Sequence, residues 1–193
     1  MNSILKQVTP SVTTMIRMDH THVLATFHRY RVDAPVHTKR SLVNLICTAL
    51  EVHAQLEEEI FYPAMRALPL DSALVDKSIP EHAEMKRLIS KLRGMGPSDV
   101  AYDDTVMELM RDVMHHVADE ETILLPHAER NLGEQIYELG ARMTKQRLEL
   151  AAPRAGEIAR DTVSAMPVSS MLLTAGAVAA GAYVLSRAFG REA

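Results

Sequence analysis

The sequence predicts an all-α fold: an up-down-up-down antiparallel four-helix bundle, followed by an additional C-terminal helix and an apolar helical tail. Apolar residues recur at steps of three and four, and alternation with a period of two is hard to find. Short breaks that each contain a proline separate the periodic stretches. Short breaks imply antiparallel neighbours, and 193 residues can bury one sizeable core and leave a tail.

Four stretches within residues 11–131 carry the helical rhythm and form the expected bundle. In each stretch, polar residues with metal-binding side chains share the apolar face, where a buried charge must be paired. The positions on these faces are Ile16, His20, Val23, Phe27 and Tyr30; Leu42, Ile46, Ala49, His53, Leu56 and Ile60; His82, Met85, Ile89 and Leu92; and Val106, Leu109, Val113, His116, Glu120 and Ile123.

The expected turns contain the residues that interrupt helices. Residues 33–35 separate the first and second helices, 68–69 the second and third, and 94–98 the third and fourth. Ser78-x-x-Glu81 has the spacing of a capping box, with a proline between its ends. We therefore expect the third helix to restart just before His82.

Three further segments follow the bundle. An amphipathic accessory helix is expected at 132–152, packed outside the bundle, then a linker at 153–167 and an apolar helix at 168–189. The chain carries no charged residue from Thr162 to Ser186, and about 20 apolar residues suffice to span a bilayer. Two interpretations of this tail stay open: a membrane anchor, or an apolar helix buried against the bundle or a partner.

The amino-acid composition limits the kinds of partner and compartment that fit this sequence. The 21 Lys and Arg residues against 25 Asp and Glu residues give a net charge of −4 without a basic stripe, so we expect no nucleic acid as the main partner. Cys47 is the single cysteine, which excludes an intrachain disulfide and suits a reducing compartment. Residues 1–10 do not resemble a signal peptide. The expected location is the cytoplasm, with membrane tethering if the tail is an anchor.

The most informative feature is a repeated carboxylate–imidazole pair. His53-x3-Glu57 recurs 63 positions later as His116-x3-Glu120, and a proline follows each pair at the same distance. Residues four apart in a helix share a face, so each pair can point at one centre. Imidazole and carboxylate ligands without thiolate favour non-haem iron or manganese.

Two acidic–histidine dipeptides extend the repeat. Asp19-His20 and Glu81-His82 lie 62 positions apart, each upstream of a His-x3-Glu pair. Helix bundles hold metals with such inward-facing side chains. The candidate metal ligands are His20, His53, Glu57, His82, His116 and Glu120.

Neighbouring residues offer alternatives. His22 competes with His20 and His115 with His116, and the repeat offsets favour His20 and His116. A metal-free structural module would require the six polar groups to satisfy one another. Three more carboxylates are expected to be solvated or to orient a ligand imidazole: Glu58, Glu59 and Glu121.

The order of these motifs resembles the hemerythrin-like (HHE cation-binding) domains. Both motifs fit the fuller signature His-x3-Glu-Glu followed by apolar residues and Pro, ending at Pro63 and Pro126. The resemblance implies two non-haem iron ions inside a four-helix bundle, bridged by carboxylates or by oxygen, with an open position for a diatomic or peroxide ligand. It implies a protein that binds or turns over oxygen, peroxide or nitric oxide in oxidative or nitrosative stress, or alternatively an iron or oxygen sensor.

The sequence departs from the oxygen-carrying hemerythrins at two positions. These proteins have a fifth His one turn after the third-helix His, where this chain has Lys86, and close the last motif with an Asp where this chain has Glu121. One imidazole fewer leaves an iron more open to exchange. Lys86 is expected to extend to solvent, or to donate a hydrogen bond to a bound peroxide. These departures favour reactive-species chemistry, sensing or iron handling over oxygen transport.

Overall fold

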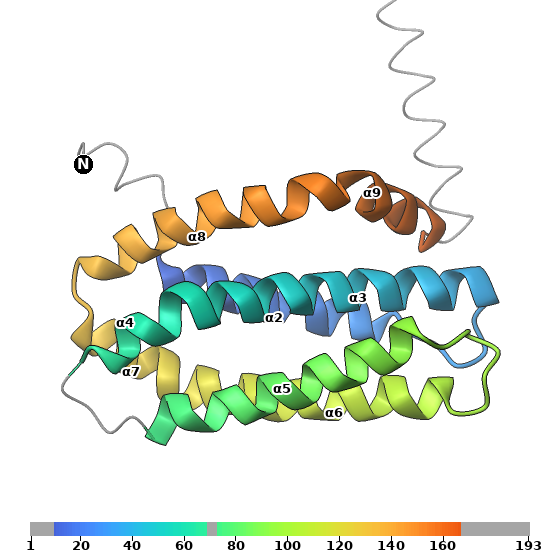
Figure 1. Cartoon of the computed structure of the whole chain (residues 1–193), viewed down its shortest axis with the longest axis horizontal. Helices are drawn as coiled ribbons and strands as arrows, with labels where there is room; N and C mark the ends of the chain where they lie inside the picture. The colour runs from blue at the N-terminus through green and yellow to red at the C-terminus, as the bar shows by residue number, and fades with distance from the viewer. Residues whose placement is uncertain (1–9, 69–72, 167–193) are drawn as a thin grey trace, which may run out of the picture.

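A computed structural model describes residues 10–68 and 73–166. The described residues form helices and turns with no β-strand, which confirms the all-α class for this part of the chain. The elements, shown in Figure 1, are α2 (Val12–His28), α3 (Val36–Leu56), the π-helical η1 (Glu57–Phe61), α4 (Tyr62–Arg66), α5 (Ala73–Arg93), α6 (Tyr102–Asp119), the π-helical η2 (Glu120–Leu124), α7 (Leu125–Asn131), α8 (Gln135–Ala151), the 3-10 helix η3 (Ala152–Arg154) and α9 (Ala155–Ser164).

Four antiparallel rods surround the interior of the bundle (Figure 1). The second rod is α3 continued by η1 and α4, and the fourth is α6 continued by η2 and α7. Both α2 and α5 pack against α3 and α6, so each rod has two neighbours. At the start of α2, the backbone N–H of Thr14 donates to the Ser11 hydroxyl at 3.1 Å, which caps the helix.

The third helix does not restart before His82. It runs without a break from Ala73, and Pro80 lies inside it. Pro80 is exposed, whereas Val75 and Ser78 are buried in the preceding two turns. Burial of these turns against the bundle outweighs the loss of one helical hydrogen bond at the proline.

A fifth helix covers one side of the bundle. In Figure 1, α8 and α9 lie beyond α2 and α3, on the side away from α5 and α6, and α8 packs on both α2 and α3. The segment expected to be a linker, 153–167, instead contains helix α9, which packs on α3. The Arg154 guanidinium, just before α9, donates to Glu51 of α3 at 2.7 Å, and Ile158 is half-buried. These contacts give the segment a helical structure.

Gly140 determines how closely α8 approaches the start of α2. A Cβ atom at Gly140 would clash with the carbonyl oxygen of Pro10. One turn later, the Thr144 hydroxyl donates to the Gly140 carbonyl at 2.9 Å and lies 3.4 Å from the sulfur of Met15. The absence of a side chain at Gly140 therefore allows the close packing of this end of α8.

Two apolar clusters fill the bundle and leave a polar layer between them. One cluster includes Phe27, Leu42 and Val106, and the other includes Ile16 and Phe61. His20 lies between the two clusters along α2, and the other predicted ligands join it at that level. Within residues 10–68 and 73–166, no helix is long and apolar enough to cross a membrane. The expected apolar helix at 168–189 lies outside the described residues.

Candidate metal centre

The six predicted ligands meet in the middle of the bundle. Four rods contribute them, none is more than 4 % exposed, and their side-chain atoms form two overlapping groups with metal-binding spacing. The ligands are His20 on α2, His53 on α3, Glu57 at the start of η1, His82 on α5, His116 on α6 and Glu120 at the start of η2.

Both glutamates begin a π-helical turn, which the sequence analysis did not predict. The backbone N–H of Tyr62 donates to the Glu57 carbonyl five residues earlier, and the N–H of Leu125 donates to the Glu120 carbonyl in the same way. The proline that follows each turn has no N–H, and its ring displaces the carbonyl four residues back. The wider turn relieves this clash, and π-bulges are frequent at functional sites.

The four imidazoles form two close pairs. The ring centroids of His20 and His53, the first pair, are 5.0 Å apart, and those of His82 and His116, the second pair, are 4.7 Å apart. Between the pairs, the centroid distances are 6.3 Å for His20–His116 and for His53–His82, and 6.2 Å for His53–His116. This spacing divides the donors into two adjacent positions, each with two imidazoles.

Each glutamate faces both positions. One oxygen of each carboxylate lies near one imidazole of the first pair and one of the second, as a bridging ligand would. The Oε2–Nε2 distances are 3.1 Å for Glu57–His53, 3.3 Å for Glu57–His82, 3.3 Å for Glu120–His20 and 3.6 Å for Glu120–His116.

Three imidazoles contact, through Nδ1, a carboxylate that is not among the six ligands; we call these the outer carboxylates. Their positions follow the sequence repeat. An ionised carboxylate only accepts, so each of these rings donates its Nδ1–H and turns the Nε2 lone pair to the centre. The contacts, each 3.0 Å, are His20–Glu121, His82–Glu58 and His116–Glu81. Two of the three carboxylates whose roles the sequence left open thus contact ligand imidazoles.

His53 differs from the other three rings. Its Nδ1 lies 3.5 Å from Oδ2 of Asp19, and neither ring nitrogen has a hydrogen-bond partner. Both oxygens of Asp19 instead accept from the Arg147 guanidinium on α8, at 2.6 and 2.5 Å. The Asp19 carboxylate, which the repeat pairs with His53, is therefore bound by Arg147.

Burial changes the proton affinity of the central groups. Burial, and then the negative charge of Glu120, raise the pKa of Glu57 well above its ordinary value. Burial, and then the charges of His116 and His53, lower the pKa of His82 to about 3, and burial also lowers the pKa of His53. Neutral imidazole is the form that binds metal, and a cation would relieve the repulsion between the carboxylates.

Tyr62 is a polar group at the centre that the sequence analysis missed. It is 1 % exposed, and its hydroxyl donates to Oε1 of Glu120 at 2.9 Å and lies 3.2 Å from Nε2 of His82. The equivalent position in the second half of the repeat is Leu125. This difference between the two halves is the signal that could have identified Tyr62.

The central atoms fit a cation. Among the described residues, seven buried side-chain nitrogen and oxygen atoms lack a hydrogen-bond partner, and five of them belong to His20, His53, Glu57 and Glu120. In the second pair, the Nε2 atoms face each other at 3.2 Å. Both are acceptors when Nδ1 carries the proton, so they cannot satisfy one another. A metal ion would supply the positive charge that these atoms need.

The competing residues lie away from the centre. His22 and His115 are exposed, whereas His20 and His116 are buried among the other donors. Glu59 is also exposed and accepts from Gln55 at 2.8 Å.

Lys86 does not point into the centre. It donates to both oxygens of Glu58 at 2.7 Å, and its side chain is 46 % exposed. It therefore reaches the centre only through Glu58 and His82.

Comparison with known proteins agrees with this geometry. The sequence profile of the Hemerythrin HHE cation binding domain matches residues 11–128. A crystal structure of a hemerythrin HHE cation binding domain-containing protein from Mycobacterium kansasii is similar at a TM-score of 0.65, with 18 % identity, over 77 % of this chain and 92 % of that one.

A curated relative from Nostoc sp. (strain PCC 7120) is named "DNA nickase". It is 30 % identical over 125 residues, which make up 65 % of this chain. The matched segment makes up 35 % of that relative, so the chain spans only about a third of its length. The profile match extends over more than half of the chain and includes all six predicted ligands. The chain therefore belongs to the hemerythrin HHE cation-binding domain family.

Proposed function

We propose that this chain is a non-haem di-iron protein that binds or turns over oxygen, peroxide or nitric oxide in oxidative or nitrosative stress. The observation that carries the proposal is the division of four imidazoles into two pairs, with Glu57 and Glu120 facing both. Nitrogen and oxygen donors without thiolate suit iron, and Cys47 is buried in the apolar cluster, away from these donors.

A small space beside the first pair supports a small ligand. A cavity of about 10 Å³ touches His20, His53 and His116, and its remaining walls include valine and leucine side chains. This volume admits a molecule about the size of water. A diatomic molecule or a peroxide is the class of ligand that suits such a space.

The protein groups around the centre have different roles. Iron, when bound, supplies redox chemistry and Lewis acidity. The outer carboxylates fix the imidazole orientation, and the two apolar clusters exclude water. The Tyr62 hydroxyl lies on the side of the second pair, where it holds a proton within reach of Glu120. The first pair has no equivalent hydroxyl, because the matching position in the repeat is Leu125.

Ligand binding by iron-loaded protein tests the proposal. Reduced protein mixed with nitric oxide or oxygen should change its absorption spectrum, and peroxide should be consumed in proportion to bound iron. The matched control is Glu120→Ala, which removes a carboxylate that faces both positions. Unchanged spectra and no peroxide consumption by fully loaded protein would contradict the proposal.

Sensing of iron is the second candidate function, and the placement of the ligands favours it. The donors come from four rods, so metal occupancy would couple directly to the stability of the whole bundle. A sensor would gain thermal stability on loading without consuming peroxide. Differential scanning calorimetry and a peroxide assay on the same loaded sample distinguish the two functions.

A further inference from the structure

We propose that a cavity beneath α8 and α9 is the entry site through which small, uncharged, weakly polar molecules reach the metal centre, and that the Asp19–Arg147 ion pair closes its inner end. This inference rests on the proposed function, because it concerns the route to the same centre. It gives the accessory helices, which contribute none of the six candidate ligands, a role in ligand access.

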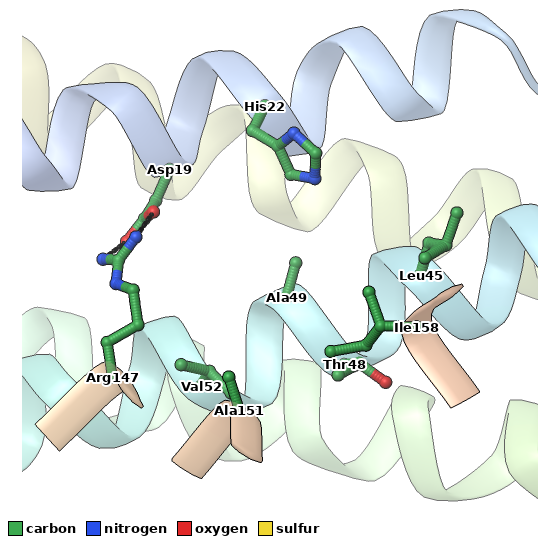
Figure 2. Close-up of a pocket in the computed structure, with 9 residues that line it drawn as sticks. All are labelled: Asp19, His22, Leu45, Thr48, Ala49, Val52, Arg147, Ala151 and Ile158. Atoms are coloured by element: carbon green, nitrogen blue, oxygen red, sulfur yellow. Dashed lines mark hydrogen bonds and ion pairs between the residues drawn. The ribbon is translucent and has the colours of Figure 1, made fainter. Parts of the chain in front are cut away.

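The entry cavity lies between the bundle and the accessory helices. Its volume is about 180 Å³, and Figure 2 shows the side chains from α2, α3, α8 and α9 that line it. A cavity of about 150 Å³ is enough to bind benzene or xenon when its walls are apolar. The apolar side chains here are Leu45, Ala49, Val52, Ala151 and Ile158.

Asp19 connects this cavity to the centre. It lines the entry cavity and also the small space that touches His20, His53 and His116. The entry cavity meets the outer faces of α2 and α3, whereas the small space lies inside the bundle. Asp19 is the one lining residue that the two spaces share, so its side chain lies between the entry cavity and the imidazoles.

The ion pair with Arg147 holds Asp19 in this position. Figure 2 shows the two side chains facing each other at one end of the cavity, joined by contacts of 2.6 and 2.5 Å. Arg147 is 32 % exposed and Asp19 is 17 % exposed, so the guanidinium can swing toward water without disturbing the core. The long 3.5 Å contact to His53 leaves the carboxylate without a second firm partner on the inner side.

The lining determines which molecules enter. Apolar walls favour dissolved gases such as nitric oxide and oxygen, which lose little hydration on entry. An anion would have to leave water for a largely apolar space, which disfavours its entry. The entry site therefore selects neutral diatomic molecules over anions such as azide.

Two substitutions should change the rate of entry in opposite directions. Ala49→Phe fills the cavity and should slow nitric oxide association with reduced, iron-loaded protein by about tenfold, which needs a barrier only ~1.4 kcal/mol higher. Arg147→Met removes the ion pair and should accelerate association. Stopped-flow absorption measures both rates, and iron content should equal that of the wild-type protein. Ala151→Leu fills the same cavity from α8 and replaces Ala49→Phe if that variant does not fold.

Matched controls separate entry from general effects. Thr38→Phe fills a different cavity near the start of α3, which includes His28 and Met166, and Arg154→Met removes an ion pair between the same accessory segment and α3. Neither should change the association rate. Unchanged rates in both Ala49→Phe and Ala151→Leu, or equal slowing by Thr38→Phe, would overturn the route.

Xenon binding gives a readout that needs no metal. Xenon should shift the methyl resonances of Leu45, Ala49 and Val52 in metal-free protein, and Ala49→Phe should abolish the shifts of Leu45 and Val52. Absence of xenon from the wild-type cavity would overturn the entry site directly. Loaded wild-type protein that forms no nitric oxide complex while xenon still binds would instead count against the proposed function.

Discussion

The hydroxyl of Tyr62 donates a 2.9 Å hydrogen bond to Oε1 of Glu120, although the two residues lie 58 positions apart and on different rods. Burial, and then the charges of Glu57 and Glu120, raise the pKa of this phenol far above its ordinary value. In the metal-free protein, Tyr62 is therefore a neutral donor that partly offsets the charge of the carboxylates.

We expect Tyr62→Phe to retain most of its iron, because Tyr62 is not one of the six candidate ligands. The variant should change the absorption spectrum and midpoint potential of the loaded protein, because the hydroxyl donates to Glu120 and lies beside His82. Tyr30→Phe is the matched control, since the buried Tyr30 hydroxyl also donates to a carboxylate, that of Asp103, in another part of the bundle. Identical spectra and potentials for Tyr62→Phe and the wild-type protein would contradict a role for this hydroxyl at the centre.

Loss of an outer carboxylate should weaken metal binding without removing a ligand. Glu58→Gln and Glu121→Gln weaken the acceptors of His82 and His20, and changes of this kind typically cost 10- to 100-fold in metal affinity (~1.4 to ~2.7 kcal/mol). Glu59→Gln is the control from the same acidic run, because Glu59 is exposed. Competition with a chelator measures the affinities, and equal affinity in all three variants would show that these contacts do not support the ligands.

Substitutions of the adjacent residues His115 and His116 should have different effects on the metal content. His116→Ala is expected to lower the metal content, because His116 is 1 % exposed and its Nε2 faces His82. His115→Ala should leave the metal content unchanged, because His115 is exposed. Elemental analysis of the two purified variants decides between them, and the reverse pattern would place the ligand on the other face of α6.

Substitution of Gly140 should loosen the accessory helix. Gly140→Ala places a methyl group against the Pro10 carbonyl, so we expect a loss of about 1 to 3 kcal/mol in the free energy of unfolding. Gly156→Ala is the control: a Cβ there meets no atom within 4 Å, and alanine favours a helix by up to ~1 kcal/mol over glycine. Urea unfolding measures both, and equal stability of the two variants would mean that α8 does not pack against Pro10 in solution.

The low pKa of His82 predicts how acid affects the metal-free protein. Because His82 takes up its proton near pH 3 when folded and near pH 6.5 when unfolded, acid favours the unfolded state as the pH falls through this window. Glu57, whose pKa is raised, acts in the opposite direction above pH 4.5. His82→Gln should therefore lose less stability than the wild-type protein between pH 6.5 and 4.5.

The exposed His115 provides the control for this titration. Urea unfolding of metal-free His115→Gln should follow the wild-type pH dependence. If His82→Gln also shows the wild-type pH dependence, burial does not lower the pKa of His82 in the folded protein.

The sequence predicted the helical class, the turns at 33–35 and 94–98 and the six central residues, because apolar residues follow a helical rhythm and the ligands recur in register on apolar faces. It predicted a restart of the third helix near Pro80, whereas α5 runs through Pro80 without a break, because the capping spacing is a local signal and the burial of Val75 is a tertiary one. It treated 153–167 as a linker, because its few apolar residues become informative only beside α3. The partners of Asp19 could not be predicted either, since Arg147 lies 128 positions away.

Iron stoichiometry after loading under reducing conditions tests the central claim most directly. Two pairs of imidazoles that share two carboxylates predict about two irons per chain, with both lost or weakened in Glu57→Ala and in Glu120→Ala. Wild-type protein that binds zinc alone, or a single metal ion that further iron cannot increase, would contradict the two-metal centre.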